Sequence, residues 1–319
     1  MSFRRVPTLR ASLGHPAKRR LLATKSAEVY ERKTPLEHVL LRPGMYIGSV
    51  ESVKTPLWVL SKEAGSTGSA AAAMEKREVE VVPGVCKIFD EILVNAADNL
   101  QRDASMDRIE VHIDDATSTT PEISVLNTGR GVPITKHKDG LYVPELVFGY
   151  LFTGSNFDDN EARLTGGRHG FGAKLTNIFS SRFEVETVDA RRRQRYTQVW
   201  RDNMGVRAEP EITGVDDGAS DYTRVTFRPD LARFGIESLG DNADVMRRRV
   251  WDIAGCNASG GSPIRAGRCA WGGEASRTPR SVCNVGRGRG AARRYAAARG
   301  GSGVRAAKLY CIKGMFFVQ

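Results

Sequence analysis

A carboxylate and a carboxamide stand four residues apart at Glu91 and Asn95, in a segment with the apolar spacing of a helix. Residues four apart share one face of a helix, so the two side chains are expected to point the same way. Oxygen ligands suit Mg²⁺, and Asn95 offers the metal one neutral oxygen while phosphates supply others. Glu91 is then free to polarise a water as a general base, a role that contributes roughly 10²–10⁴ in rate. A solvated polar helix face explains the same spacing, so the pair needs support from elsewhere in the chain.

A glycine-rich segment at residues 165–174 gives that support. Four of its ten residues are glycine, and a helix is expected to follow, so its backbone can approach a polyphosphate while helix N–H groups favour the negative charge. Lys174, in the first turn, is expected to reach a terminal phosphate. The segment lacks the ending of a Walker loop. Its candidate nucleotide-binding residues are Gly167, Arg168, His169, Gly170, Phe171, Gly172, Ala173 and Lys174.

Two shorter patterns are weaker by themselves. Asn127 opens the run Asn-Thr-Gly-Arg-Gly at the end of a predicted strand. A side-chain amide followed by two glycines can recognise an adenine edge and leave room for the base, although turns of this kind are common. Ser155 and Asn156 are small polar residues in a predicted loop.

The elements that must position these residues follow from the apolar periodicity. A helix is predicted from Val85 to about Leu100, with apolar residues at three-and-four spacing. A second helix is predicted over residues 173–180, and a third over 243–254, ending at Gly255 as a C-cap. Alternating runs predict strands at residues 109–113, 122–126, 183–188, 196–200 and 223–227, and the third and fourth of these form a hairpin with a charged tip.

The net charge of +11 is confined to the last sixty residues. Residues 260–319 contain twelve Lys and Arg and one acid, Glu274, whereas the rest of the chain is neutral. The basic balance therefore says little about what the folded part binds. Leu, Ile, Val and Phe are nine of these sixty residues, fewer than a packed core needs. A disordered, nucleic-acid-binding tail and translation in the wrong reading frame both explain this composition.

Other segments set the domain boundaries. Residues 1–29 are basic and free of acids before Glu28, which fits a disordered tail or a mitochondrial targeting segment. The low-complexity stretch 61–74 predicts a flexible insertion. No run of apolar residues is long enough to span a membrane. The five cysteines form no CxxC pair, which speaks against a zinc site and a disulfide framework.

The order and spacing of these motifs resemble those of a known ATP-binding site. ExxxN on a helix, then NxGxG, then a glycine-rich lid is the ATP site of the gyrase, heat-shock chaperone, histidine-kinase and MutL superfamily. Within it, the chain resembles eukaryotic topoisomerase II at TPLEHVLLRPGMYIGSV (34–50), KIFDEILVNAADNLQRD (87–103) and YVPELVFGYLFTGSNFDD (142–159). The likeness runs from about Tyr30 to Gly255 and is broken mainly by the insertion. The same blocks speak against a chaperone or a histidine kinase.

The resemblance implies a role for each matching residue. It makes Glu91 the general base, Asn95 the Mg²⁺ ligand and Asn127 a neighbour of adenine. It makes Ser155 and Asn156 a ribose- and phosphate-contacting loop and residues 167–174 the triphosphate lid. Tyr30 matches an arm residue that reaches the partner subunit's nucleotide.

Three departures from the family stand out. Gly154 replaces the usual Ser and His169 the usual Asn, and either change is expected to weaken a hydrogen bond to the nucleotide, unless a backbone N–H makes that bond. After Gly260 the chain lacks the family's second domain, whose lysine contacts the γ-phosphate. Because the likeness ends where the composition changes, we expect a frameshift, a premature end or a faulty gene model. Without the lysine of the second domain, we expect only feeble ATP hydrolysis.

These observations predict an α+β fold of two layers, with a mixed, mostly antiparallel sheet and helices on one face, the Bergerat ATP-binding fold. The ATPase domain is placed at residues 30–259. The expected function is Mg²⁺-dependent ATP hydrolysis that drives dimer closure, and in a full enzyme the passage of double-stranded DNA through a cut duplex. The alternative is an inactive fragment that binds nucleic acid or interferes with the enzyme. The family is nuclear, and the basic N-terminus permits a mitochondrial form.

Overall fold

The computed structural model describes residues 32–60, 74–103, 105–114, 118–151 and 170–258, together with short strands between residues 264 and 317. The chain divides into two compact units, residues 1–38 and 39–319. Helix α2 (Pro35–Leu41) crosses the boundary between these units and begins at a capping box. The Glu37 carboxylate accepts hydrogen bonds from the Thr34 N–H and hydroxyl at 2.7 and 2.9 Å, and the Thr34 hydroxyl accepts one from the Glu37 N–H. Local polar contacts therefore start this helix.

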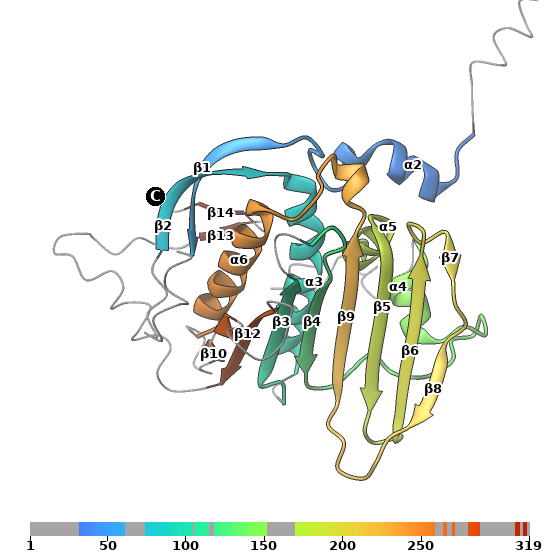
Figure 1. The fold of residues 1–319 in the computed structure, drawn as a ribbon. Helices are drawn as coiled ribbons and strands as arrows, with labels where there is room; N and C mark the ends of the chain where they lie inside the picture. Colours follow the sequence, from blue (N-terminus) through green and yellow to red (C-terminus); the bar gives the residue numbers. More distant parts are fainter. Residues whose placement is uncertain are drawn as a thin grey trace, which may run out of the picture. The chain divides into compact units, whose positions relative to one another are not determined.

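The second unit is built on one large antiparallel sheet (Figure 1). Its strand order is β10-β12-β3-β4-β9-β5-β6-β7, and every pairing among the strands that the structure describes is antiparallel. The central strands are β3 (Arg108–Asp114), β4 (Ile123–Thr128), β9 (Tyr222–Pro229), β5 (Ser180–Asp189) and β6 (Gln194–Arg201). Two short strands, β7 (Val206–Arg207) and β8 (Glu211–Gly214), both pair with β6. This agrees with the predicted α+β architecture.

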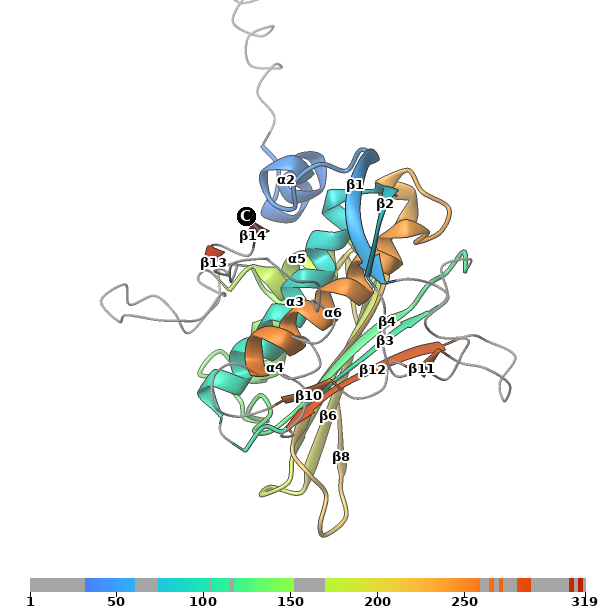
Figure 2. The ribbon, with the colours of Figure 1, turned by 90° about the vertical axis from the view of Figure 1, so that its left-hand side faces the viewer.

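The helices lie on one face of this sheet, as Figure 2 shows for α3, α4, α5 and α6. Their bounds are Pro83–Arg102 for α3, Val143–Gly149 for α4, Gly172–Ile178 for α5 and Asp241–Ala258 for α6, with 3-10 turns at Pro43–Met45 and Leu231–Phe234. The predicted helix at residues 85–100 is confirmed as α3. The helix predicted to end at Gly255 instead continues to Ala258, because one glycine inside a helix costs only about 1 kcal/mol.

The core lies between the sheet and α3. Val111, Val125, Val225 and Val185 are register neighbours on four adjacent strands, and each is no more than 5% exposed. The helix contributes a stripe of buried residues to the same core: Val85, Ile88, Phe89, Ile92, Leu93, Ala96 and Ala97. The opposite face of the sheet carries cross-strand ion pairs, such as Arg228 with Glu122, so only the helix-covered face is sealed from water.

A separate hairpin, β1 (Val53–Leu60) and β2 (Met74–Val81), precedes α3 and was not predicted. Pro56 lies within β1 and charged residues alternate along β2, which hid both strands in the sequence. All but the last residue of the expected insertion at 61–74 lies outside the described residues, since Met74 opens β2.

The chain after Gly260 includes several short strands among its described residues, and the disordered tail stays a prediction. The strands are β10 (Ile264–Ala266), β11 (Ala270–Trp271), β12 (Arg280–Arg287) and a pair of strands, β13 (Tyr310–Ile312) and β14 (Met315–Phe317). Strand β12 pairs along the edge of β3, whose N–H and C=O groups need partners. The proposed reading-frame change is a separate matter and stays a prediction.

Candidate functional site

Helix α3 carries the two residues expected to do chemistry. The Glu91 side chain is 21% exposed, and its Oε1 forms an ion pair with Nζ of Lys87, one turn earlier. Asn95, one turn later, is exposed. The three side chains thus follow one line along the helix, as residues four apart must.

The first residue of α5 lies against the Glu91 carboxylate. A Cβ atom added at Gly172 would overlap Oε2 of Glu91 and lie 3.0 Å from its Cδ. Any side chain at position 172 would therefore displace Glu91. The two helices are also joined by the buried Thr176 hydroxyl, which donates a 2.8 Å hydrogen bond to the carbonyl of Ile88. The end of the glycine-rich segment and the Glu91 side chain are held together.

Lys174 is folded back rather than extended. Its side chain is buried, and Nζ donates a 2.7 Å hydrogen bond to the carbonyl of Gly170. Gly170 has φ +64°, a left-handed conformation that favours glycine. Burial lowers the pKa of Lys174 to about 8. The ammonium therefore lies within the end of the glycine-rich segment, and its expected contact with a terminal phosphate stays a prediction.

Asn127 lies at the far end of the site, where β4 leads into a tight turn. Asp103, which follows α3, holds that turn, because its carboxylate accepts a hydrogen bond from the N–H of Arg130. The same hydrogen bond lowers the pKa of Asp103. Gly129 has φ +87°, and a Cβ atom there would lie 2.8 Å from both Asp103 and Met106. The first glycine of the turn is thus required both by its backbone angle and by lack of space.

A row of polar side chains continues from Asn127 across the sheet. Thr223 pairs with Asn127 on one side and with Thr187 on the other, so the three side chains occupy one face of β4, β9 and β5. The two threonine hydroxyls are 3.0 Å apart. The N–H of Val132 donates to the Thr187 hydroxyl at 3.2 Å, and a Cβ atom at Gly131 would overlap that hydroxyl. The second glycine of the turn thus allows the loop to approach the threonine.

Sequence reasoning missed Thr187 and Thr223. Both are buried, at positions where neighbouring inward-facing residues of their strands are Val and Phe. A threonine that interrupts an apolar alternation was the available signal, but β-branched threonine is also an ordinary strand residue.

Helix α3 separates the candidate residues near Glu91 from those near Asp103. Glu91 and Asp103 lie twelve residues apart on α3 and its C-cap, so at 1.5 Å per residue they are about 18 Å apart along the helix axis. Glycine backbone and a carboxylate lie at one end, and an amide and hydroxyls at the other.

Comparison with known proteins gives consistent results. Residues 81–233 match the family described as histidine kinase-, DNA gyrase B- and HSP90-like ATPases. DNA topoisomerase 2 of Arabidopsis thaliana is 50% identical over 245 residues, which are 76% of this chain and 16% of that protein. The solved ATPase region of Saccharomyces cerevisiae topoisomerase II is 48% identical, with a TM-score of 0.66 over 72% of this chain and 58% of that one. This part of the chain is homologous to the ATPase region of topoisomerase II.

The chain spans only about a sixth of the length of its topoisomerase II relatives. The shared part is the ATPase region, in agreement with the predicted domain. Nothing in these likenesses favours the alternative of an inactive fragment that acts on nucleic acid. A relative from Dictyostelium discoideum, 45% identical over 270 residues covering 73% of this chain and 20% of that protein, is named as mitochondrial.

Several predicted site residues cannot be placed. Tyr30, Ser155, Asn156, Gly167, Arg168 and His169 lie outside the described residues, as does Gly154. The structure does place Glu91, Asn95, Asn127 and residues 170–174.

Among the residues that the structure describes, no three His, Cys, Asp or Glu side chains are grouped to hold a metal ion. None of the described helices is both long and apolar enough to cross a bilayer.

Proposed function

We propose that residues 30–259 bind ATP along α3 and hydrolyse it, with Glu91 as the general base. The observation that carries this proposal is the contact between the Glu91 carboxylate and Gly172, where the glycine-rich segment enters α5. A polyphosphate cradled by that segment would have its terminal phosphorus next to Glu91. A water between that phosphorus and Glu91 could then pass its proton to the carboxylate as it attacks in line, while the bond to the ADP oxygen on the opposite side breaks.

The proposed metal is Mg²⁺, and the residues present fit it only with help from the nucleotide. Asn95 is exposed on the same face of α3 as Glu91 and offers one neutral oxygen. With no acidic cluster among the described residues, phosphate oxygens and water would complete the ligand set. Mg²⁺ bound there would neutralise phosphate charge.

The other end of the site is proposed to hold the adenine. The Asn127 amide and the hydroxyls of Thr187 and Thr223 form a polar edge beside a turn whose two glycines leave room for a flat ring. Ser155 and Asn156 are proposed to contact the ribose and phosphates, and residues 167–174 to close over the triphosphate. Tyr30 is proposed to reach the nucleotide of a second subunit.

The larger role is proposed from the family. ATP binding would bring two such domains together as a homodimer and close a gate on double-stranded DNA, which a full-length enzyme would pass through a cut duplex. We propose the nucleus as the compartment. Fusion of residues 1–29 to a reporter would reveal a mitochondrial form.

The test is Glu91→Gln in the full chain, measured by single-turnover hydrolysis and by binding of a non-hydrolysable ATP analogue. Loss of the general base is expected to lower the hydrolysis rate roughly 10²–10⁴-fold. Because glutamine keeps the size of the side chain, analogue affinity should stay within about threefold, or 0.65 kcal/mol. Unchanged turnover in the variant would rule out Glu91 as the base.

A further inference from the structure

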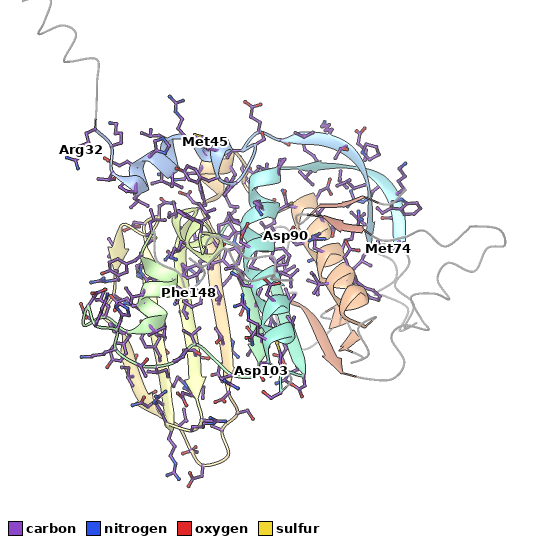
Figure 3. The ribbon with its side chains drawn as sticks, turned by 180° about the vertical axis from the view of Figure 1, so that it is seen from behind. Arg32, Met45, Met74, Asp90, Asp103 and Phe148 are labelled. Atoms are coloured by element: carbon purple, nitrogen blue, oxygen red, sulfur yellow. The ribbon has the colours of Figure 1, made fainter. Side chains whose placement is uncertain are left out.

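Asp90, the residue before Glu91, faces the opposite neighbour of α3. Nε of Arg249, on α6, lies 3.0 and 3.1 Å from the two carboxylate oxygens of Asp90. The two side chains are 21% and 14% exposed. Figure 3 shows Asp90 on α3 with α6 alongside. This ion pair joins the two helices.

Polar side chains from both helices lie beside this ion pair. Asp252, three residues after Arg249, has its Oδ2 3.7 Å from a guanidinium nitrogen of Arg249. Cys86, one turn before Asp90, places its Sγ 3.7 Å from Oδ1 of Asn242 on α6. Burial raises the pKa of the Cys86 thiol to about 12, and burial also raises the pKa of Asp90, against the opposing effect of Arg249. An unpaired carboxylate at position 90 would therefore be costly.

Asp90 and Glu91 lie on adjacent faces of α3, so the Asp90–Arg249 ion pair bears on where Glu91 points. Successive residues of an α-helix are about 100° apart around the axis, since a turn contains 3.6 residues. With Asp90 tied to α6, Glu91 is directed to the adjacent face, where its carboxylate meets Gly172. A small rotation of α3 would move that carboxylate away from the end of the glycine-rich segment, and a displacement of about 1 Å can cost a hundredfold in rate.

We propose that Asp90 and Arg249 are positioning residues that hold α3 in the rotation at which Glu91 can act as the general base. The inference rests on the proposed function. It assigns to α6 a part in catalysis although no residue of α6 touches the Glu91 carboxylate in the contacts described above.

The test compares Asp90→Asn, Arg249→Met and Arg249→Lys with a matched control. The control is Arg77→Met, which breaks two ion pairs elsewhere on α6, those of Arg77 with Asp241 and Asp244 at 3.0 and 2.6 Å. Single-turnover hydrolysis, affinity for a non-hydrolysable ATP analogue and thermal unfolding are measured on the full chain.

Asp90→Asn and Arg249→Met are expected to lower the hydrolysis rate at least about tenfold while analogue affinity stays within about threefold. Arg249→Lys keeps the charge and should recover part of the rate. Arg77→Met should unfold at a lower temperature yet hydrolyse ATP within about twofold of the unaltered chain, because it leaves the Asp90 contact in place.

Equal rates in folded Asp90→Asn and the unaltered chain would overturn the proposal, as would a parallel loss of analogue affinity or an equal loss of rate in Arg77→Met. If Arg249→Met does not fold, Asp90→Asn decides. A Glu91→Gln variant in the same series separates the two proposals. If Glu91→Gln abolishes turnover and Asp90→Asn does not lower it, only the positioning role fails. If Glu91→Gln keeps full turnover, the proposed function itself has failed and the positioning role fails with it.

Discussion

The two sides of α3 are built in opposite ways. Toward α6 the contact is closed by Asp90 and Arg249, whose charges satisfy each other between apolar residues. Toward α5 the contact is between the Glu91 carboxylate and the backbone of Gly172, with no side chain between them. Glycine lets a ligand approach a backbone closely, whereas a paired carboxylate is costly to leave without its partner. On the proposal above, the α6 side positions the helix and the α5 side presents Glu91 to the ligand.

The strongest way to break this contrast is to add a side chain on the α5 side. Gly172→Ala places a methyl group where the Glu91 carboxylate lies, so Glu91 must move. We expect hydrolysis to fall about a hundredfold or more, since a displacement of about 1 Å at the reacting centre can cost that much.

The control for that substitution is Gly214→Ala in β8, where an added Cβ would meet no atom within 4 Å. Its hydrolysis rate should match that of the unaltered chain in the same single-turnover assay. A Gly172→Ala variant that hydrolyses ATP normally would show that the close contact has no part in the reaction.

A second prediction concerns pH. Burial lowers the pKa of Lys174 from 10.5 to about 8, so its charge is lost in the folded chain as the pH rises through 8. If the charged form binds phosphate, analogue affinity should fall by up to about fivefold between pH 8 and pH 9, as the charged fraction falls from about half to about a tenth. Lys174→Met should bind more weakly at pH 7 and lose this dependence, as titrations at pH 7, 8 and 9 would reveal. The same pH dependence in both proteins would contradict the role of Lys174.

Lys174 also predicts an effect on stability of opposite sign. Between about pH 8 and 10.5 the folded chain binds fewer protons than the unfolded chain, because the pKa is lower in the folded state. The free energy of unfolding should therefore rise with pH in this window through this group. Urea unfolding of Lys174→Met should lack that contribution.

The smallest effect on ATP chemistry is expected on the α6 side, away from the ion pair. Oδ1 of Asn242 accepts a 2.8 Å hydrogen bond from the buried N–H of Val82, at the start of α3. Asn242→Ala leaves that N–H without this partner and should lower the free energy of unfolding by about 1–3 kcal/mol. Hydrolysis by the folded variant should change less than about threefold. A loss as large as that of Gly172→Ala would show that the two sides are not distinct.

The sequence predicted one side of this contrast and missed the other. Glu91 and Asn95 share a face because they are four apart, and glycines before a helix predict a phosphate site, so both follow from local rules. The Asp90–Arg249 pair joins residues 159 apart, and periodicity does not specify which charged residues of two helices meet. Only the assembled packing of α3 on α6 decides that.

The same limit applies to the proposed adenine-binding end of the site. Asn127 was found because glycines follow it, which is a local signal. Thr187 and Thr223 were missed because their meaning depends on the register of three strands, and register is set by the whole sheet. The orientation of Lys174 toward Gly170 also depends on its buried surroundings and not on its position in the first turn of α5.

The position of β9 has a consequence for the order in which the chain can fold as it leaves the ribosome. This strand comes last of the five central strands in the sequence yet lies between β4 and β5. Until residue 229 has been synthesised, β3 with β4 and β5 with β6 can form only separate hairpins, and long-range pairing of this kind is slow. Thr223 joins Asn127 to Thr187 only when that insertion is complete, so a nascent chain should gain nothing from ATP before then.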